Sequence, residues 1–464
     1  MSREEHFIAA LESAVGREDL REATGDRWPY GMDNSRRHAL PLAVLIARDH
    51  EQVAAAVRVC AEHRLPVTVR GRGTGTAGGA VPEHGGLVIS MERMDRVLEF
   101  VPEDRLIVVE AGITNAVVQQ AVAQAGFFWP PDPTSSAICT VGGNIACNAA
   151  GPKAVKYGST REHVLGLRAV TGQGNTLRTG VRTTKGVVGY DLTRLLIGSE
   201  GTLGLVTEAT LKLTPRPESR RMFRALYSNM RCASLAISRL MAQPVTPSAL
   251  EFIDSMALDL LRRHRGVDLP EEAGALLMLE IDGTEATVSD GAREILRTAD
   301  GPGCLEVRAA ADDDEAVQLW AARKALSPTL RHLAPKKINE DVVVPVSRIP
   351  ELTDTLAEVA EAQGLIIASF GHAGNGNLHV NLMVDPDDPE QMARAEIALE
   401  AIFRRVLDLG GTLSGEHGIG RVKRAFVSME LDDVALETMQ AIRRAMDPLG
   451  ILNPGNKLPD PASP

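Results

Sequence analysis

The sequence has few of the features that mark iron–sulfur proteins, disulfide-stabilised proteins or membrane-spanning proteins. Its five cysteines, at positions 60, 139, 147, 232 and 304, form no Cys-x-x-Cys pair, so they predict neither a disulfide framework nor an iron–sulfur cluster held by this chain. The longest apolar run, around Leu42 to Ala47, is far too short to span a bilayer. The first six residues carry charges where a signal peptide has an apolar core. We therefore expect a cytoplasmic protein whose redox centre is organic or supplied by a partner.

Basic residues are also fewer than acidic ones. Asp and Glu outnumber Lys and Arg by 61 to 50, which gives a formal net charge of −11, and no basic run is interleaved with aromatic residues. These features exclude a typical nucleic-acid-binding protein. With 464 residues, 44% of them hydrophobic and 24% charged, the chain has a globular composition and is too long for a single core. We therefore expect two or more domains.

Glycine-rich turns that carry histidine and glutamate are the most informative feature present. Residues 370–379 read FGHAGNGNLH and place His372 seven residues before His379, and residues 413–420 read LSGEHGIG and pair Glu416 with His417. The glycines and asparagines between the first two histidines disfavour a helix and permit a tight reversal, so both rings can face one point. Imidazole and carboxylate groups are ligands for zinc and other divalent metals. The two segments predict a metal site with a further imidazole beside it, and ordinary loop histidines are the alternative.

Another glycine-rich loop lies in the N-terminal half. Apolar residues recur at helical spacing over residues 50–63, a Leu-Pro pair at 65–66 ends this helix, and residues 67–69 predict a strand. The strand runs into residues 70–79, RGRGTGTAGG. Glycines let backbone N–H groups approach a pyrophosphate without interference from a Cβ atom. The loop is therefore a candidate phosphate cradle, with a flexible turn as the alternative.

This loop does not fit a nicotinamide dinucleotide site. Its glycines match the spacing of the dinucleotide fingerprint, and Glu92 lies near the distance expected for the acidic residue that binds a ribose. The fingerprint must open a helix, however, and here Pro82 and two glycines intervene before the next predicted strand, at residues 87–90. A nicotinamide site is therefore disfavoured.

Two further segments are rich in small and polar residues. Residues 130–152 include the runs PPDPTSS and TVGGNIACNAAGP, and residues 198–208 read GSEGTLGLVTE. Their hydroxyls and amides suit hydrogen bonding to a large polar cofactor. Together with the loop at 70–79, these segments predict one extended ligand.

The combination of these motifs resembles a known flavoprotein family. The strand and loop at 67–79, the PDP-T-S run, the GGNIACNAAGP and GSEGTLG segments, and the HAGNGNLH and SGEHGIG motifs are similar to those of the p-cresol methylhydroxylase / vanillyl-alcohol oxidase superfamily. Within it, the match is to FAD-linked D-2-hydroxyacid dehydrogenases, which include D-lactate dehydrogenase, the FAD subunit of glycolate oxidase and D-2-hydroxyglutarate dehydrogenase. The resemblance extends from about Pro41 to Lys457 and leaves the preferred acid open.

The resemblance implies an α+β, two-domain fold of the vanillyl-alcohol-oxidase type. An FAD-binding domain of the p-cresol methylhydroxylase type would comprise residues 1–214 and be completed by residues 425–464. Residues 215–424 would form a substrate-binding cap, built on an antiparallel sheet, that carries the metal site. Some superfamily members tether FAD to a histidine of the glycine loop. Thr74 occupies the equivalent position here, so the FAD should be bound non-covalently.

The resemblance also implies which residues bind FAD. The pyrophosphate is expected on the backbone amides of the glycine loop, the flavin and ribityl chain beside the segment at 130–152, and the adenine end beside the segment at 198–208. The residues expected to bind FAD are Arg72, Gly73, Thr74, Gly75, Thr76, Gly78, Pro131, Asp132, Thr134, Ser135, Thr140, Gly142, Gly143, Asn144, Glu200, Gly201 and Val206.

The cap is expected to bind the substrate. The sequence LWAARK at residues 319–324 resembles the family's WxxR element, whose arginine, here Arg323, binds the substrate carboxylate. A guanidinium fork suits two carboxylate oxygens, and a solvated helix face is the alternative for a single arginine. Lys337, which precedes the run NEDVVVP, is a second candidate for a carboxylate contact, and by family analogy Asn381 reaches the substrate. Asn375 stands where aspartate is usual in the family. Because this position is not a metal ligand in the family pattern, the change alters the charge near the metal site more than the set of ligands.

The predicted activity is the metal-assisted oxidation of a small D-2-hydroxy acid, such as D-lactate or glycolate, to the 2-oxo acid. A divalent metal, expected to be zinc, would bind His372, His379 and Glu416. His417 would take the hydroxyl proton as general base while a hydride passes to flavin N5. Electrons would leave to a non-NAD acceptor: a quinone, a cytochrome, an electron-transfer flavoprotein or an iron–sulfur subunit. Peripheral association with the inner membrane and a homodimer stay open.

Other classes of protein remain as alternatives. A D-2-hydroxyglutarate dehydrogenase would carry the same motifs. A flavin oxidase that acts on alcohols or phenols with molecular oxygen would keep the FAD motifs but has no use for His372 and His379. A non-enzymatic FAD- or metal-binding module would show no bleaching of the flavin by a substrate.

Overall fold

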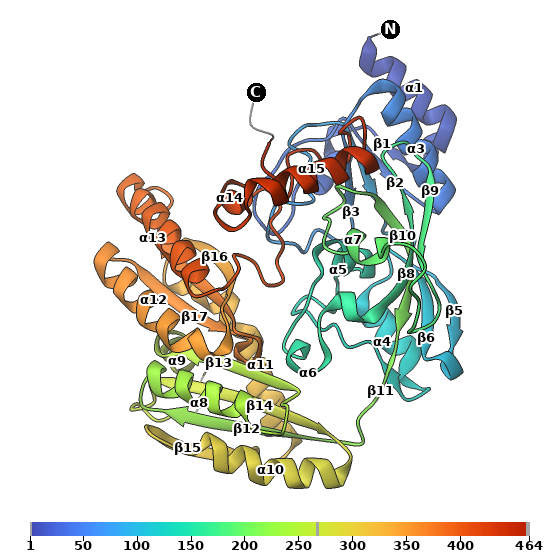
Figure 1. Cartoon of the computed structure of the whole chain (residues 1–464). Helices are drawn as coiled ribbons and strands as arrows, with labels where there is room; N and C mark the ends of the chain where they lie inside the picture. Colours follow the sequence, from blue (N-terminus) through green and yellow to red (C-terminus); the bar gives the residue numbers. More distant parts are fainter. Residues whose placement is uncertain (1, 266–268, 461–464) are drawn as a thin grey trace. The chain divides into compact units, whose positions relative to one another are not determined.

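A computed structural model describes residues 2–265 and 269–460 of the chain (Figure 1). The chain forms two compact units. The first unit consists of Met1–Ala150, Gly158–Arg216 and Glu416–Pro464, and the second consists of Gly151–Tyr157 and Pro217–Gly415. Both units contain helices and sheets, so the predicted α+β class is confirmed.

The first unit is built on two main sheets. Its strands are β1 (Leu20–Arg21), β2 (Ala43–Ile46), β3 (Val67–Arg70), β4 (Leu87–Ser90), β5 (Val97–Val101), β6 (Leu106–Glu110), β7 (Phe127–Phe128), β8 (Val164–Val170), β9 (Thr176–Gly180), β10 (Leu205–Lys212) and β11 (Thr214–Pro215). One sheet has the order β1-β2-β4-β3, the other has the antiparallel order β5-β6-β10-β8-β9, and β11 pairs with β7. In the first sheet, β2 and β3 both run parallel to β4. Every residue of β2 and β4 is buried, which explains their apolar sequences on both faces.

Two helices of the first unit, α1 (Arg3–Val15) and α3 (His50–His63), pack against the first sheet. The other helices of the unit are α2 (Thr24–Arg27), α4 (Asn115–Ala123), α5 (Val141–Cys147), α7 (Leu192–Leu196), α14 (Val427–Glu430) and α15 (Asp433–Met446). The side chain of Asp49 caps α3, and Arg64 ends it in a left-handed conformation. The predicted helix at 50–63 and the predicted strands at 67–69 and 87–90 are confirmed. Apolar residues of α1, α3 and the sheet form one buried core, and each fully buried aliphatic side chain stabilises it by about 1.5–3 kcal/mol.

The second unit is built on one seven-stranded antiparallel sheet. Its strands are β12 (Ser219–Tyr227), β13 (Ala249–Asp254), β14 (Ala275–Gly283), β15 (Cys304–Ala309), β16 (Lys336–Val343), β17 (Ile366–Gly371) and β18 (Asn377–Val384). Their order is β15-β12-β14-β13-β17-β18-β16. Three of the residues predicted to bind metal and substrate lie on two of these strands: Lys337 on β16, and His379 and Asn381 on β18.

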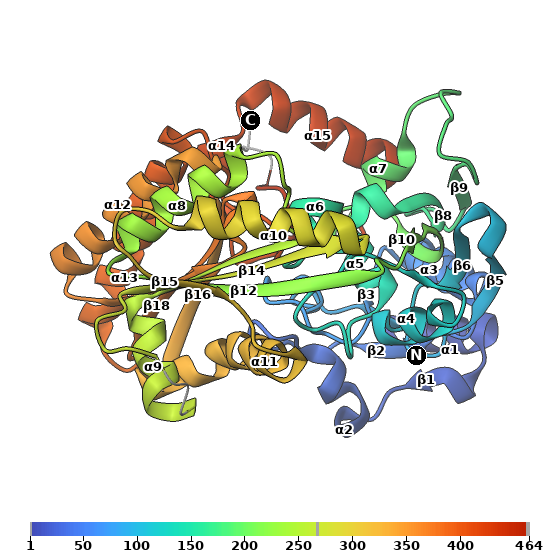
Figure 2. The same cartoon turned by 90° about the horizontal axis from the view of Figure 1, so that it is seen from below.

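Helices lie on both faces of this sheet. The helices are α6 (Ala154–Tyr157), α8 (Met230–Ala242), α9 (Ser255–Arg265), α10 (Glu285–Ala299), α11 (Asp313–Thr329), α12 (Ile349–Gln363) and α13 (Pro389–Asp408). Figure 2 shows α8, α10 and α12 on one face of the sheet and α9 and α11 on the other, where they share an apolar core with the strands. Within residues 2–265 and 269–460, no helix is long and apolar enough to cross a bilayer.

Candidate functional site

A tight hairpin in the second unit carries both histidines of the FGHAGNGNLH motif. Strand β17 leads into a 3-10 turn at Ala373–Asn375, and β18 returns antiparallel to β17. Gly376 has a φ of 77°, and a Cβ atom there would lie 1.8 Å from the backbone oxygen of Val344, so the turn requires glycine. The reversal brings the ring centroids of His372 and His379 to 5.1 Å, with an angle of 89° between the rings. The two rings therefore lie beside each other, and that both face one metal stays a prediction.

A buried carboxylate faces each of these histidines. Oε1 of Glu251, on β13, lies 2.5 Å from Nδ1 of His372. Oδ1 of Asp341, on β16, lies 3.8 Å from Nδ1 of His379. Both acidic side chains are completely buried. Only the contact to Glu251 is within hydrogen-bond distance, and it favours the tautomer of His372 that carries its hydrogen on Nδ1 and leaves Nε2 for a metal, an arrangement common around metal-ligating histidines.

Glu251 also binds Arg323, the predicted carboxylate-binding residue. Arg323 extends from α11 and is buried, its Nε donates a hydrogen bond to Oε2 of Glu251 over 2.7 Å, and its guanidinium lies 4.7 Å from the ring centroid of Phe370. Burial raises the pKa of the Glu251 carboxyl, but the charges and hydrogen bonds of His372 and Arg323 outweigh burial and hold that pKa below its usual value. Glu251 is therefore an ionised group shared by a histidine and an arginine.

Asp341 holds the chain segment that leads to the second motif. Its carboxylate accepts hydrogen bonds from the backbone N–H of Gly415 over 2.9 Å, from the hydroxyl of Ser414 over 3.3 Å and from Nδ2 of Asn377 over 2.6 Å. Asp341 and Ser414 also form a parallel β-bridge. These contacts fix the two residues that immediately precede residues 416–417.

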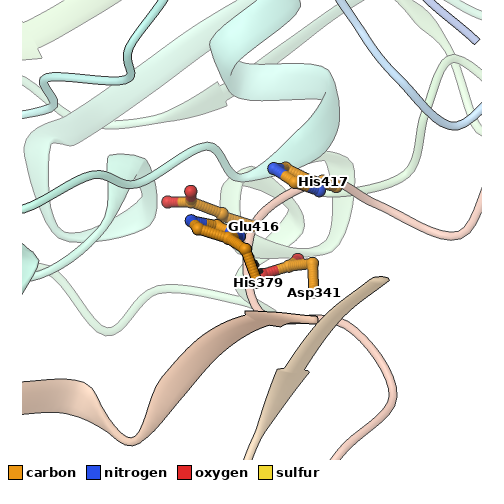
Figure 3. Close-up of side chains that lie close together, drawn as sticks. All are labelled: Asp341, His379, Glu416 and His417. Carbon is orange, nitrogen blue, oxygen red and sulfur yellow. Dashed lines mark ion pairs between the residues drawn. The ribbon is translucent and has the colours of Figure 1, made fainter. Parts of the chain in front are cut away.

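Four candidate metal ligands gather at this point (Figure 3). Asp341, His379, Glu416 and His417 each offer one ligand atom, and these atoms all lie within 4.8 Å of one another. Glu416 and His417 directly follow the end of the second unit, and their ligand atoms lie within 4.8 Å of each other. Carboxylate oxygens and imidazole nitrogens at such a spacing fit zinc or another divalent metal. His372 is not a member of this group, although its ring adjoins that of His379.

The other two predicted substrate contacts lie on the strands beside this cluster. Nζ of Lys337, on β16, donates a hydrogen bond to the hydroxyl of Ser327 over 2.6 Å. Asn381, on β18, is completely buried, and its Nδ2 donates to the backbone oxygens of Ala368 and His379. Residues 379 and 381 point to the same face of the strand because side chains alternate along it. The buried Oδ1 of Asn381 has no hydrogen-bond partner within the described ranges.

Sequence reasoning missed Glu251 and Asp341. Asp341 lies inside the NEDVVVP run, where nothing local distinguishes it from its acidic neighbour. Glu251 lies in a strand far from every motif in the sequence, and only the pairing of β13 with β17 brings it beside His372. Both residues act through tertiary contacts, which leave no pattern in a single sequence.

The glycine loop of the first unit follows β3 without opening a helix. Residues 71–82 form bends and turns, so the loop lacks the helix that the dinucleotide fingerprint must open. A Cβ atom on Gly71 would lie 2.3 Å from Oγ1 of Thr140, whereas a Cβ atom on Gly75 would meet no atom within 4 Å. The loop is therefore closely packed at one glycine and borders open space at the other, as expected for a cradle that a pyrophosphate fills.

The second small-residue segment contains the short helix α5, which the sequence analysis did not predict. Thr140 caps it by accepting a hydrogen bond from the backbone N–H of Gly143 over 3.1 Å. A Cβ atom on Gly142 would lie 2.8 Å from the Cβ atom of Ala111, so this glycine permits close packing of the helix. Nδ2 of buried Asn144 makes no hydrogen bond to an oxygen or nitrogen of the described residues. A polar cofactor would satisfy this amide.

Glu200, predicted to lie beside the adenine, binds a backbone turn of the first unit. Its carboxylate accepts hydrogen bonds from the N–H groups of Ile419 over 2.9 Å and Gly420 over 2.7 Å. Nζ of Lys457 lies 3.5 Å from Oε1 of the same carboxylate. Glu200 has a φ of 55°, a left-handed conformation that surrounding contacts must hold. The turn that it binds begins two residues after His417.

The remaining residues predicted to bind FAD belong to the same unit. Nη1 of Arg72 lies 3.5 Å from Oε2 of Glu92. The backbone oxygen of Pro131 accepts a hydrogen bond from Nδ2 of Asn115 over 2.8 Å. The others lie on loops of this unit or at the start of β10: Gly73, Thr74, Thr76, Gly78, Asp132, Thr134, Ser135, Gly201 and Val206.

Comparison with known proteins gives matches along nearly the whole chain. A family model described as an FAD binding domain matches residues 41–180, and one described as the C-terminal domain of FAD linked oxidases matches residues 216–457. The glycolate oxidase subunit GlcD of Bacillus subtilis (strain 168) is 38% identical over 446 residues, which cover 96% of this chain and 95% of that protein. A D-lactate dehydrogenase of Anaerostipes hadrus is 34% identical over 458 residues, which cover 97% of this chain and 95% of that protein.

Solved structures share the fold at lower identity. The structure of p-cresol methylhydroxylase with substrate bound has a TM-score of 0.78 and 17% identity, and the match covers 99% of this chain and 97% of that one. The structure of 4-ethylphenol oxidase from Gulosibacter chungangensis in complex with isoeugenol has a TM-score of 0.75 and 17% identity, with coverage of 99% and 98%. At this identity the likeness shows the fold alone. The predicted two-domain fold of the vanillyl-alcohol-oxidase type is confirmed.

Proposed function

Because the chain belongs to the family of FAD linked oxidases and is an FAD-linked hydroxy acid dehydrogenase, we propose that its substrate is a small D-2-hydroxy acid, such as D-lactate or glycolate. The observation that carries this proposal is the pair of adjacent buried histidines, one of them hydrogen-bonded to the same Glu251 carboxylate that binds buried Arg323. A 2-hydroxy acid offers a hydroxyl oxygen to a metal and a carboxylate to a guanidinium, so it suits both groups.

The first unit is proposed to hold FAD through its three small-residue segments. The glycine loop from Arg72 to Gly78 would bind the pyrophosphate, residues 131–144 the flavin and ribityl chain, and residues 200–206 the adenine end. The flavin, when bound, accepts a hydride from the substrate carbon at N5. Because Thr74 replaces the histidine used for tethering, acid precipitation should release the yellow colour into the supernatant. A washed pellet that stays coloured would contradict non-covalent binding.

His372, His379 and Glu416 are proposed to hold a divalent metal, with zinc the first candidate. The metal, when bound, would lower the pKa of the substrate hydroxyl. Asp341 lies in the same cluster, but its two oxygens accept hydrogen bonds from a side-chain amide and from a backbone N–H. We therefore assign Asp341 the role of holding the segment that leads to Glu416 rather than of binding the metal.

The remaining side chains bind the acid and move its proton. His417 adjoins Glu416 in the chain and takes the hydroxyl proton as general base. Nε of Arg323 already donates to Glu251, which leaves the terminal nitrogens of the guanidinium to bind the substrate carboxylate. Asn381 and Lys337 are proposed as further polar contacts to the substrate.

Electrons are proposed to pass from the reduced flavin to a separate acceptor. The cysteine spacing provides no iron–sulfur motif and the loop at 70–79 provides no nicotinamide site. The relative from Bacillus subtilis is named as a subunit, which supports a partner chain for this protein as well. The chemical class of acceptor would be a quinone, a cytochrome, an electron-transfer flavoprotein or an iron–sulfur protein.

Anaerobic reduction of the flavin tests this proposal. FAD-loaded protein is mixed without oxygen with D-lactate, glycolate, D-2-hydroxyglutarate or D-malate, and bleaching of the flavin is followed with time. We expect D-lactate or glycolate to bleach the flavin fastest and to yield one 2-oxo acid per flavin. Fastest bleaching by D-2-hydroxyglutarate would overturn the choice of a small acid. Bleaching by a phenolic alcohol but by none of the four acids would overturn the hydroxy acid reaction.

A further inference from the structure

We infer that Glu251 is a positioning residue that couples the metal site to the substrate-carboxylate site through one buried carboxylate. The inference rests on the proposed function, because its two partners are a proposed metal ligand, His372, and the proposed carboxylate contact, Arg323.

Glu251 occupies a position where an acidic residue is unfavourable by itself. It lies within β13, opposite Met278 of β14, and every residue of β13 is buried. Its neighbours Leu250 and Phe252 are apolar and belong to the core. An ionised carboxylate in such a place destabilises the protein strongly unless it is paired and hydrogen-bonded. Its pairing should therefore have a role that apolar packing cannot fill.

The two oxygens of this carboxylate bind two different partners. Oε1 lies 2.5 Å from Nδ1 of His372, and Oε2 accepts a hydrogen bond from Nε of Arg323 over 2.7 Å. Phe370 completes the arrangement, because the guanidinium lies 4.7 Å from its ring centroid and Phe370 precedes His372 by two residues in the chain. One side chain on β13 therefore contacts a residue at the hairpin of β17 and a residue of α11.

Each contact decides how its partner can act. The carboxylate at Nδ1 of His372 holds the hydrogen on that nitrogen, so coordination by the ring falls to Nε2. The bond to Nε of Arg323, together with the ring of Phe370, fixes the plane of the guanidinium. The carboxylate cannot rotate to improve one contact without weakening the other. Metal binding and capture of the substrate carboxylate should therefore change together.

Replacement of Glu251 by glutamine breaks this shared contact while keeping the shape of the side chain. A carboxamide has one acceptor oxygen, so its NH2 group must face the N–H of either His372 or Arg323, and the negative charge between them is lost. The matched control is Asp254→Asn. Asp254 is a second buried acidic residue of β13, and its carboxylate binds the backbone N–H of Ala257 and Ser369.

The experiment compares these two variants with the wild-type protein, each loaded with FAD. Competition with a chromophoric chelator gives the Kd for zinc, and anaerobic flavin reduction gives the half-saturating concentration of D-lactate and the limiting rate. For Glu251→Gln we expect the Kd for zinc to rise about 10- to 100-fold, the loss typical for a residue that orients a metal ligand. The half-saturating D-lactate concentration should rise roughly tenfold or more, with a smaller fall in the limiting rate. Asp254→Asn should change both affinities less than about twofold.

The inference is overturned if either the Kd for zinc or the half-saturating concentration in Glu251→Gln stays within about twofold of the control. If Glu251→Gln does not fold, Glu251→Asp takes its place, because aspartate keeps the charge but is one methylene too short to reach both partners. Wild-type affinities in Glu251→Asp would also overturn the inference. Failure of the proposed function is distinguishable, because wild-type protein itself would then fail to bind zinc or to be bleached by a hydroxy acid.

Discussion

The two units of the chain provide their candidate binding groups in different ways. In the first unit, the proposed FAD contacts are glycines such as Gly73 and Gly75 and small polar side chains such as Asn144. In the second unit, the groups at the proposed metal and substrate sites are buried and charged, with Glu251 and Arg323 as the clearest pair. A large cofactor is bound through backbone N–H groups and open space, whereas a metal and a carboxylate need ionised side chains whose burial must be compensated by pairing. Variants should therefore lose one ligand and keep the other.

The largest expected effect comes from His417→Asn. Loss of the general base should slow anaerobic reduction of the flavin by roughly 10²–10⁴-fold, while zinc and FAD stay bound. Rapid mixing with D-lactate measures the rate, and elemental analysis measures the metal. Glu416→Ala is the companion variant and should lose zinc because an anionic ligand is removed. Normal flavin reduction by His417→Asn, or joint unfolding of both variants, would remove this pair from the chemistry.

Arg323→Ala should have the next largest effect. Removal of a buried, charge-assisted contact to the substrate carboxylate should cost about 2–4 kcal/mol in transition-state binding, measured through kcat/KM. FAD content should remain at the wild-type value, because the first unit is unchanged. Lys324→Ala is a matched control, since Lys324 is the exposed neighbour of Arg323 on the same helix. Equal kcat/KM values for the two variants would exclude Arg323 from the substrate site.

Gly71→Ala tests whether a change in the first unit weakens FAD binding and leaves zinc binding unchanged. Its new Cβ atom would lie 2.3 Å from Oγ1 of Thr140, so the loop must shift, at a cost of about 1–3 kcal/mol. FAD affinity should fall accordingly, and zinc affinity should not change. Gly25→Ala is the control, because a Cβ atom there meets no atom within 4 Å. A variant that loses zinc together with FAD would break the proposed separation of the two sites.

The smallest expected effect concerns an ion pair whose two residues are not proposed to bind FAD, metal or substrate. Hydrogen bonds from Arg308 lower the pKa of Glu315 to about 2. A folded-state pKa below the unfolded value of 4.5 means that this carboxylate stabilises the protein above that pH, and that the stabilisation is lost as the pH falls toward 2. Glu315→Gln should lower the free energy of unfolding by about 1 kcal/mol at pH 7 and by less at pH 3.

Urea unfolding of Glu315→Gln and the wild type at both pH values checks this prediction. The zinc and FAD affinities of the variant should equal those of the wild type at neutral pH. A difference in unfolding free energy that is the same at pH 7 and pH 3 would contradict the pairing of Glu315 with Arg308.

Local patterns in the sequence predicted local structure well. Apolar spacing and the following Leu-Pro pair were enough to place the helix at 50–63 and the strand after it. Glycine and asparagine between His372 and His379 were enough to predict a tight reversal that brings the two rings close together. The motif combination also identified the family of FAD-linked hydroxy acid dehydrogenases, which the comparisons confirm.

Contacts between distant strands could not be predicted in this way. Glu251 reads as one acidic residue in an apolar strand, and its partners come from a hairpin and a helix far along the chain. Glu200 shows the same limit, because its carboxylate binds the backbone of Ile419 and Gly420, which has no side-chain signature. The assignment of individual residues to FAD, metal and substrate stays a prediction.

The most direct test asks whether flavin reduction requires a metal that FAD binding does not require. Zinc is removed from the FAD-loaded protein by chelation, removal is verified by elemental analysis, and the protein is mixed anaerobically with D-lactate and with glycolate. We predict that metal-free protein keeps its FAD, is not bleached by either acid, and recovers its rate when zinc is added back. Bleaching at the full rate in protein with no detectable metal would contradict the proposed role of His372, His379 and Glu416.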